Sequence, residues 1–292
     1  MMKDLLLSLR PQQWIKNTFI FAALVFAKKL GEPHQILLSC LAFCCFCALS
    51  SAVYLINDVR DAEADRQHPI KRNRPIAAGR MRPGVAVLMA LVLAGAGLFG
   101  CAMINGLLLS MAGAYLGLNI LYTLWLKRVA VLDVMSIAVG FVLRAAAGGA
   151  AIQVEISSWL IICTFFLALF LGLAKRRHEL VLLEDNSARH RANLAEYSPY
   201  LLDQMIGIVT TGTLVCYILY TLSEEVQKKL QVKNLYLTIP FVLYGIYRYL
   251  YLIHKREGGG NPSSTLVSDR PLLLAVFFWG VAAAAILYFG RR

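Results

Sequence analysis

The chain has 292 residues, of which 59% are hydrophobic and only 16% are charged, and its mean hydropathy is +0.62. This composition excludes an ordinary soluble domain, in which about 25% of the residues are charged. The formal net charge of +12 is by itself compatible with nucleic-acid binding, but the excess lies in short polar segments between apolar ones. Positive-inside topology and contact with anionic lipids explain such a distribution. The composition therefore predicts a multi-pass membrane protein that does not bind nucleic acid.

Apolar segments long enough to cross a bilayer recur along the whole chain. A spanning helix needs about 20 predominantly apolar residues. Nine windows meet this requirement, near residues 14–30, 35–56, 83–104, 106–125, 129–152, 157–174, 203–222, 234–254 and 271–289. They are too long and too uniformly apolar for the strands of a membrane barrel. The sequence therefore predicts an all-α fold, with nine transmembrane helices in a single domain over residues 1–292.

The long polar segments predict the orientation of the chain. Lys and Arg residues concentrate in segments 57–82, 175–202 and 255–270, which fall on one side of the membrane together with the N-terminus. Because positive loops stay inside, this side is expected to be cytoplasmic, in a bacterial-type inner membrane. None of these segments is long enough for a soluble domain. We therefore expect a site built from helix ends and loops, in a central cavity that opens to the cytoplasm.

A cluster of acids follows directly on the apolar run that ends at Ile56. If the helix continues past Ile56, four oxygen-bearing side chains at offsets of three and four share one face. They are Asn57, Asp58, Asp61 and Asp65. Mg²⁺ usually takes one or two carboxylates from a protein and further oxygens from a phosphate-bearing substrate. The following segment supplies complementary cations, which are Arg66, Lys71, Arg72, Arg74, Arg80 and Arg82. Acids and cations together predict a metal-bridged phosphate site.

Further polar residues lie at helix ends that are expected on the same side. They are Lys16, Asn17, Tyr122, Lys127, Lys175, Arg176 and Glu179. We expect these residues to contact the substrate, and the cations among them to contact its phosphates. The alternative for Lys175 and Arg176 is that they snorkel to the interface, and the alternative for the cations of segment 66–82 is that they enforce topology or contact lipid headgroups. The alternative for Tyr122 is an interfacial anchor.

Two charged residues fall inside the predicted span 129–152. Asp133 and Arg144 are eleven residues apart, so they share a face of the helix but lie too far apart to pair directly. A charge exposed to hydrocarbon is costly. We therefore expect both to face the cavity, Asp133 near its mouth beside the metal or the ribose hydroxyls, and Arg144 deeper. The alternative is an ion pair with another helix.

These residues also support a resemblance to a known family. The spacing N-D-x-x-D-x-x-x-D, from Asn57 to Asp65, resembles the first motif of the UbiA superfamily of intramembrane prenyltransferases, and the resemblance covers essentially the whole chain. It implies nine transmembrane helices around a cavity with a cytoplasmic polar cap. It also implies that Asp58, Asp61 and Asp65 are catalytic and hold Mg²⁺, with Asn57 as a ligand or an orienting neighbour.

The chain departs from the superfamily's prenyltransferases after the sixth predicted span. Those enzymes usually carry a second aspartate-rich motif there, whereas this chain has Lys175-Arg176-Arg177-His178-Glu179, followed by Glu184-Asp185 without the aspartate spacing. This pattern, together with segments 10–17 and 71–79, is similar to the decaprenyl-phosphate phosphoribosyltransferases. The resemblance implies Mg²⁺-dependent transfer of 5-phosphoribose from phosphoribosyl pyrophosphate to a polyprenyl phosphate. It also implies that diphosphate is released and that the product is a precursor for the cell wall.

Two other functions stay open on the sequence alone. One is an aromatic or quinone-precursor prenyltransferase of the same superfamily, which uses polyprenyl diphosphate as its electrophile. Lys175 and Arg176 favour phosphoribosyl transfer over this alternative. The other is a non-catalytic lipid-phosphate transporter or scaffold, which does not require the complete acid motif. Membrane lipids are expected partners in every case, and the sequence leaves a homo-oligomer open.

Overall fold

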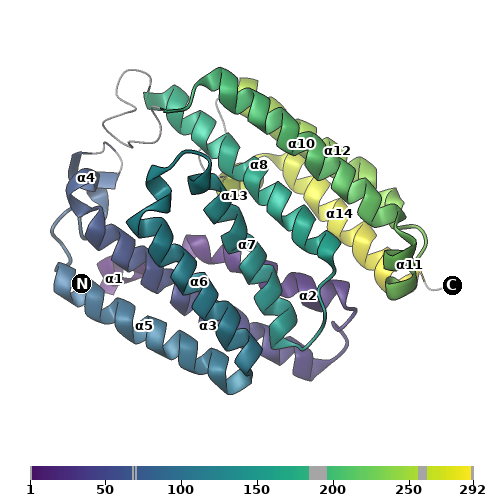
Figure 1. Cartoon of the computed structure of the whole chain (residues 1–292), viewed down its shortest axis with the longest axis horizontal. Coiled ribbons are helices and arrows are strands. Elements are labelled where there is room, and N and C mark those ends of the chain that lie inside the picture. The colour runs from purple at the N-terminus through teal and green to yellow at the C-terminus, as the bar shows by residue number, and fades with distance from the viewer. Residues whose placement is uncertain (1, 68, 70, 184–195, 256–261, 291–292) are drawn as a thin grey trace. The chain divides into compact units, whose positions relative to one another are not determined.

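A computed structural model of the chain describes residues 2–67, 69, 71–183, 196–255 and 262–290. All regular structure in these ranges is helical (Figure 1). Eight helical segments are long and apolar enough to cross a membrane. They contain α3 (Pro33–Arg60), α5 (Pro83–Ile104), α6 (Gly106–Leu124), α7 (Leu132–Ala151), α8 (Ser158–Leu183), α10 (Pro199–Leu222), α12 (Ile239–Lys255) and α14 (Arg270–Phe289). The predicted all-α membrane fold is confirmed.

The remaining described helices are short. They are α1 (Met2–Leu9), η1 (Pro11–Ile20), α2 (Phe21–Phe26), α4 (Ala62–Gln67), η2 (Lys71–Asn73), η3 (Leu126–Arg128), α11 (Glu224–Leu230), η5 (Leu235–Thr238) and α13 (Pro262–Ser268). The four elements labelled η are 3₁₀ helices, and η1 occupies the start of the predicted span 14–30.

The predicted span 14–30 is therefore not one long α-helix, and the count of nine spans is not confirmed. Arg10 adopts a left-handed conformation, and Pro11 then begins η1. Trp14 Nε1 donates to Ser51 Oγ at 3.0 Å, and the Asn17 amide donates to Ser50 Oγ at 3.2 Å. These hydrogen bonds hold Trp14 and Asn17 against α3. The apolar pattern of the segment gives no sign of them. The central cavity and the cytoplasmic cap stay predictions.

Helix boundaries follow from local sequence chemistry. Proline occupies the first turn of α3, α5, α10 and α14, where its missing N–H costs no hydrogen bond. Asn105, Ser198 and Asp269 precede α6, α10 and α14, and each side chain accepts the N–H of the residue three positions later. The predicted windows match most of the observed helices closely from α5 onward, but α8 continues to Leu183, past the predicted end at residue 174.

The chain forms two compact units. Unit 1 consists of residues 1–24, 29–127 and 143–155, and unit 2 consists of residues 25–28, 128–142 and 156–292. One of the boundaries between them, at residues 142 and 143, falls inside α7. The prediction that residues 1–292 are one family domain stays a prediction.

Packing in unit 1 centres on the pair α3 and α5. A Cβ at Gly97 of α5 would lie 2.8 Å from the Leu49 side chain, so glycine allows the close approach of the two helices. Leu55, Ile76 and Ala86 belong to a buried apolar cluster, which forms a second contact between the same helices. This cluster joins α3 to the segment that follows the acid motif, so it holds the two ends of segment 57–74 together.

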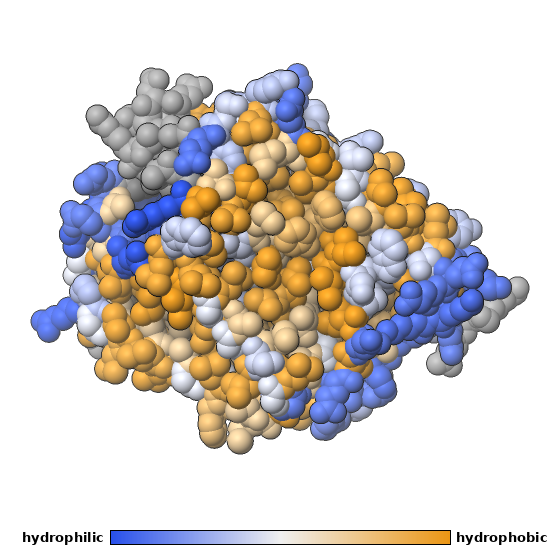
Figure 2. Space-filling view, in the orientation of Figure 1, coloured by the Kyte–Doolittle hydropathy of each residue, from blue (hydrophilic) through white to orange (hydrophobic). Residues whose placement is uncertain are grey.

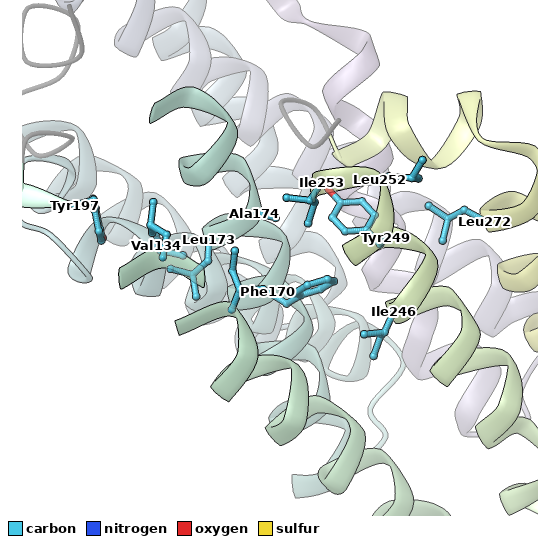
Figure 3. Close-up of a cluster of buried hydrophobic side chains, with 12 residues drawn as sticks. Val134, Phe170, Leu173, Ala174, Tyr197, Ile246, Tyr249, Leu252, Ile253 and Leu272 are labelled. Carbon is cyan, nitrogen blue, oxygen red and sulfur yellow. The ribbon is translucent and has the colours of Figure 1, made fainter. Parts of the chain in front are cut away.

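Packing in unit 2 joins α8 to α10 and α12 to α14. The rings of Phe170 and Tyr249 meet edge to face, with centroids 5.3 Å apart. Figure 3 shows these two rings in one buried cluster with Val134, at the start of α7, and Tyr197. This cluster holds the first turns of α7 against α8.

Large apolar side chains remain exposed on the surface of the helices. On α5 they include Leu88, Leu91, Val92 and Phe99, each more than 60% exposed. Figure 2 shows such apolar side chains over much of the face that it draws. Contiguous apolar surface of this extent is unfavourable in water but suits contact with lipid. The protein is a multi-pass membrane protein.

Candidate functional site

The acid cluster lies where α3 passes into α4. The Asp61 N–H donates to the Asn57 carbonyl at 2.9 Å, and the Asp65 N–H donates to the Asp61 carbonyl at 2.8 Å. Helical hydrogen bonding therefore continues across the junction, as the spacing of the motif requires. Asp58 and Asp65 are buried, whereas Asn57 and Asp61 are half-buried.

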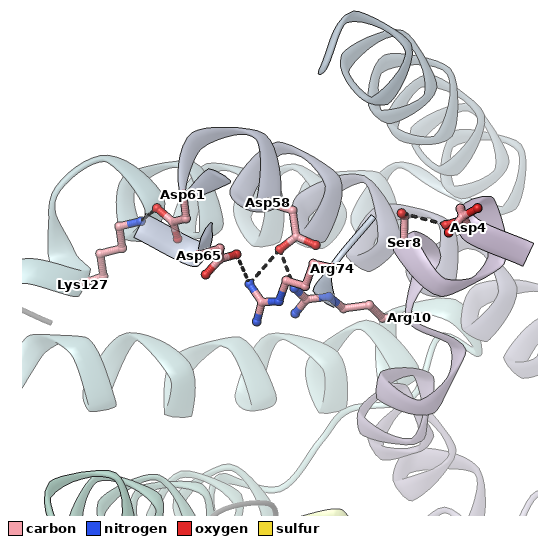
Figure 4. A network of polar contacts seen from close by, with 8 residues as sticks. All are labelled: Asp4, Ser8, Arg10, Asp58, Asp61, Asp65, Arg74 and Lys127. Atoms are coloured by element: carbon pink, nitrogen blue, oxygen red, sulfur yellow. Dashed lines mark hydrogen bonds and ion pairs between the residues drawn. The ribbon is translucent and has the colours of Figure 1, made fainter. Parts of the chain in front are cut away.

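Each aspartate of the motif pairs with a cation of unit 1 (Figure 4). Arg74 Nη1 lies 3.0 Å from Asp58 Oδ1 and 2.5 Å from Asp65 Oδ2, so one nitrogen joins two carboxylates. Arg10 also forms an ion pair with Asp58. Lys127 Nζ in η3 lies 2.6 Å from Asp61 Oδ1. The predicted residues Asp58, Asp65 and Arg74 are thus brought together, and Lys127 joins Asp61.

The carboxylates of Asp58 and Asp65 lie close enough together to be compared with the ligands of a Mg²⁺ site. Their oxygens surround one position that a cationic nitrogen occupies, and two carboxylates are the usual protein contribution to a Mg²⁺ site. Asp61 is directed to Lys127 instead. No group of three or more His, Cys, Asp and Glu side chains that could hold a metal occurs within the described residues. The arrangement fits Mg²⁺ bound by two carboxylates, with other ligands from a substrate, better than a site made by the protein alone.

The other cations of segment 66–74 lie outside this contact. Arg66 donates to the Ala77 carbonyl at 3.3 Å and pairs with Glu63 at 2.5 Å. Arg72 is exposed, and Lys71 is half-buried in η2. Arg74 is thus the cation of segment 66–74 whose ion pairs with Asp58 and Asp65 the described residues show.

A second polar group lies inside unit 1 around Arg144, which is buried. Arg144 Nε donates to Asn17 Oδ1 at 2.8 Å, and Arg144 Nη2 donates to the Tyr115 hydroxyl at 2.8 Å. The Lys16 side chain lies within electrostatic range of both Arg144 and Arg10. Arg144 is thus buried together with Asn17, another predicted site residue, from a distant segment of the chain. The expectation that Arg144 faces a cavity stays a prediction.

Unit 2 contains a separate charged group around Asp133, which is fully buried. Its Oδ2 accepts from Arg176 Nε at 2.6 Å, and its Oδ1 accepts from the Tyr197 hydroxyl at 2.9 Å. Arg176 Nη1 also donates to Glu179 at 2.6 Å. Burial raises the pKa of Tyr197 to about 12, so its hydroxyl keeps the proton that it donates at neutral pH.

This arrangement differs from the expected roles of Asp133 and Arg176. Asp133 was expected beside the metal or the ribose, but it forms the alternative, an ion pair with another helix. Arg176 was expected to contact a phosphate, but it is only 1% exposed and donates to carboxylates. The physical reason is that a guanidinium buried among apolar side chains requires anionic partners. Lys175 differs, because 44% of its side chain is exposed while it lies 3.8 Å from Glu179.

Three residues of these groups were not among the predicted site residues. Arg10 pairs with Asp58, Tyr115 accepts from Arg144, and Tyr197 donates to Asp133. The sequence gave an indication for Arg10, because it is the first residue of segment 10–17, which supports the family resemblance. Tyr115 and Tyr197 are aromatic residues in or beside apolar helices, and no sequence pattern separates them from the other tyrosines. Tyr122 of α6 is half-buried.

Known proteins resemble this chain over most of its length. A decaprenyl-phosphate phosphoribosyltransferase from Mycolicibacterium smegmatis is 34% identical, with 99% of this chain and 94% of the relative aligned. One from Corynebacterium glutamicum is 33% identical, with 96% and 86% aligned. A solved structure of a UbiA homolog from Archaeoglobus fulgidus, bound to GPP and Mg²⁺, has a TM-score of 0.71 at 18% identity, with 98% of each chain covered.

The family itself is established by a direct match. Residues 18–279 match the model of the UbiA prenyltransferase family, and this range contains the complete acid motif and α8. The similarity to the solved structure independently supports the same fold. The chain belongs to the UbiA prenyltransferase family.

Proposed function

We propose that this protein transfers 5-phosphoribose from phosphoribosyl pyrophosphate to a polyprenyl phosphate and releases diphosphate. The names of the relatives, which align over nearly the whole chain, support this reaction class. The observation that carries the proposal is the contact of Arg74 with both Asp58 and Asp65. A diphosphate-bearing donor needs cations for its oxygens and carboxylates for its metal, and this group supplies both in one place.

The reaction needs charge stabilisation more than proton transfer. The bond between C1 of the ribose and the diphosphate oxygen breaks, and an oxygen of the lipid phosphate forms the new bond to C1. The acceptor phosphate is already an anion, so no general base is required. Negative charge grows on the departing diphosphate, and preorganised cations stabilise such charge. When bound, Mg²⁺ held by Asp58 and Asp65 supplies Lewis-acid stabilisation of the same charge.

The cations of unit 1 are suited to this task. Arg74 and Arg10 both contact Asp58, so their guanidinium groups stand beside the proposed metal position. Arginine can bind phosphate oxygens through two parallel hydrogen bonds. In the proposed complex, these two arginines exchange carboxylate oxygens for diphosphate oxygens. Lys127, which contacts Asp61, supplies a third positive charge near the motif.

The proposed setting is a bacterial inner membrane, with the N-terminus and the site on the cytoplasmic side. The distribution of Lys and Arg supports this orientation. Phosphoribosyl pyrophosphate is highly charged and water-soluble, so a cytoplasmic site gives it access. A polyprenyl phosphate would reach the same site through the lipid that surrounds the exposed apolar side chains.

The test is transfer by purified protein in lipid nanodiscs. Protein supplied with labelled phosphoribosyl pyrophosphate, polyprenyl phosphate and Mg²⁺ is expected to form labelled lipid, and chelation of Mg²⁺ is expected to stop the reaction. Asp65→Asn is expected to lower kcat at least about a hundredfold, because it removes one of the two carboxylates that would hold Mg²⁺ beside the leaving group. Glu63→Gln is the matched control, since Glu63 lies on the same helix but is exposed and pairs with Arg66.

Two outcomes would contradict the proposal. If the protein forms no labelled lipid but prenylates an aromatic acid from polyprenyl diphosphate, it is a prenyltransferase of the same family. If it binds the phosphorylated lipid with neither reaction, it is a lipid-phosphate transporter or scaffold.

A further inference from the structure

The hydroxyl of Tyr197 joins two parts of unit 2. It accepts a hydrogen bond from the Val131 N–H at 2.6 Å, and it donates one to Asp133 Oδ1 at 2.9 Å. Tyr197 is buried and belongs to none of the motifs that the sequence presents. One of its hydrogen bonds ends in the turn that leads into α7, and the other ends in the first turn of α7 itself.

This turn is strained at Val131. The residue has a φ of 68°, in the left-handed region that β-branched side chains strongly disfavour. Such a conformation persists only where the surrounding structure holds it. The hydrogen bond from the Val131 N–H to Tyr197 supplies one such restraint. Because Asp133 follows two residues later, the same hydroxyl fixes both the turn and the carboxylate.

The contacts continue from Asp133 to half-buried residues in the C-terminal part of α8. Asp133 Oδ2 accepts from Arg176 Nε at 2.6 Å, and Arg176 Nη1 donates to Glu179 Oε2 at 2.6 Å. Glu179 also lies 3.8 Å from the ammonium group of Lys175. A continuous series of contacts therefore connects a buried hydroxyl to the partly exposed Lys175.

We propose that Tyr197 is a positioning residue of the transferase, which acts through Asp133 and Arg176 to hold Glu179 and Lys175 in place for the donor. The inference rests on the proposed function, because Lys175 has a phosphate to bind only if the substrate carries one. Arg176, in this arrangement, organises the end of α8 and does not itself contact the substrate.

The same apolar cluster contains a matched control, Tyr249 (Figure 3). Tyr249 is also buried, but its hydroxyl has no hydrogen-bond partner among the described residues. Tyr249→Phe and Tyr197→Phe therefore delete the same atom from the same cluster. The first change breaks no described hydrogen bond, whereas the second breaks two, with Val131 and Asp133.

Steady-state kinetics in nanodiscs test the positioning role. Tyr197→Phe is expected to raise the KM for phosphoribosyl pyrophosphate about tenfold with little change in kcat. The reason is that a displaced Lys175 would weaken binding of the donor without changing the chemical step. Tyr249→Phe is expected to leave both constants within about twofold. A purely structural role would instead reduce the amount of folded enzyme, and so lower the apparent kcat at constant KM. That pattern in Tyr197→Phe overturns the proposal.

Amide hydrogen exchange supplies a readout that does not depend on activity. Peptides that cover residues 129–134 and 175–181 are expected to exchange faster in Tyr197→Phe than in the wild type or Tyr249→Phe. Unchanged exchange in these peptides overturns the proposal. If the wild type transfers no phosphoribose, the proposed function fails and takes the positioning role with it. An unchanged donor KM in an active Tyr197→Phe enzyme overturns the positioning role alone.

Discussion

Arg176 and Asp133 form an ion pair in the interior of unit 2, with Arg176 Nε 2.6 Å from Asp133 Oδ2 and side chains that are 2% and 0% exposed. Such a pair is costly to form, but it is more costly to break, because the remaining charge is buried without its partner. The stability of unit 2 therefore depends on both residues being present.

Arg176→Ala is expected to destabilise the protein by about 3–5 kcal/mol, since it leaves the Asp133 carboxylate buried. The measurement is thermal or denaturant unfolding in detergent. Arg177→Ala is the control, because Arg177 pairs with Asp203 in a partly exposed position and is expected to cost about 1 kcal/mol or less. Equal losses of stability in the two variants would show that the buried pair contributes no more than the partly exposed one.

Arg74→Gln is expected to strengthen Mg²⁺ binding in the absence of substrate. The Arg74 guanidinium occupies the position between Asp58 and Asp65, so the ion must compete with it. The change is expected to lower the Kd for Mg²⁺ about tenfold, or ~1.4 kcal/mol, in calorimetric titration. The same variant is expected to raise the KM for the phosphorylated donor, because a phosphate contact is lost.

The control for this experiment is Arg80→Gln. Arg80 pairs with Asp4, outside the motif, at 2.8 Å. Its removal is expected to leave the Kd for Mg²⁺ unchanged. Equal metal affinity in wild type and Arg74→Gln would mean that the guanidinium does not compete with the metal.

Arg144→Met is expected to separate stability from activity. The Arg144 guanidinium donates to the neutral side chains of Asn17 and Tyr115 inside unit 1. The change removes a buried charge, which is itself costly, but it also leaves two neutral acceptors without this donor, at a cost of about 1–3 kcal/mol. If Arg144 serves the substrate, Tm is expected to stay within a few degrees while kcat/KM falls at least about tenfold. A large loss of Tm would assign Arg144 a structural role instead.

Gly148→Ala is expected to destabilise unit 1. A Cβ at Gly148 would overlap the carbonyl group of Ile20, so the end of η1 would have to move away from α7. Overpacking of this kind costs about 1–3 kcal/mol. Gly95→Ala is the control, because a Cβ there meets nothing within 4 Å, and the change is expected to stabilise α5 by up to about 1 kcal/mol. The two values are compared by thermal unfolding, and a neutral Gly148→Ala would refute the close contact.

The helices and the acid motif were predictable because their signals are local. Apolar runs of the length of α5 or α14 have one stable form in a membrane, and Pro83 and Asp269 mark where two of them begin. The spacing of Asp58, Asp61 and Asp65 follows the helical period, so one helical path presents all three acids. The segment 14–30 is not one α-helix, and its apolar residues gave no sign of the contacts that Trp14 and Asn17 make with α3.

The sequence by itself therefore determined that the protein is an all-α membrane protein with an acidic helix end and nearby cations. Only the tertiary structure decided which cation meets which acid: Arg74 meets Asp58 and Asp65, Lys127 meets Asp61, and Arg176 meets Asp133. The physical reason is that helical periodicity fixes the direction of a side chain within its own helix, whereas an ion pair depends on distances between helices. Tyr197 had no sequence signal at all, because its role exists only through the residues that the fold places around its hydroxyl.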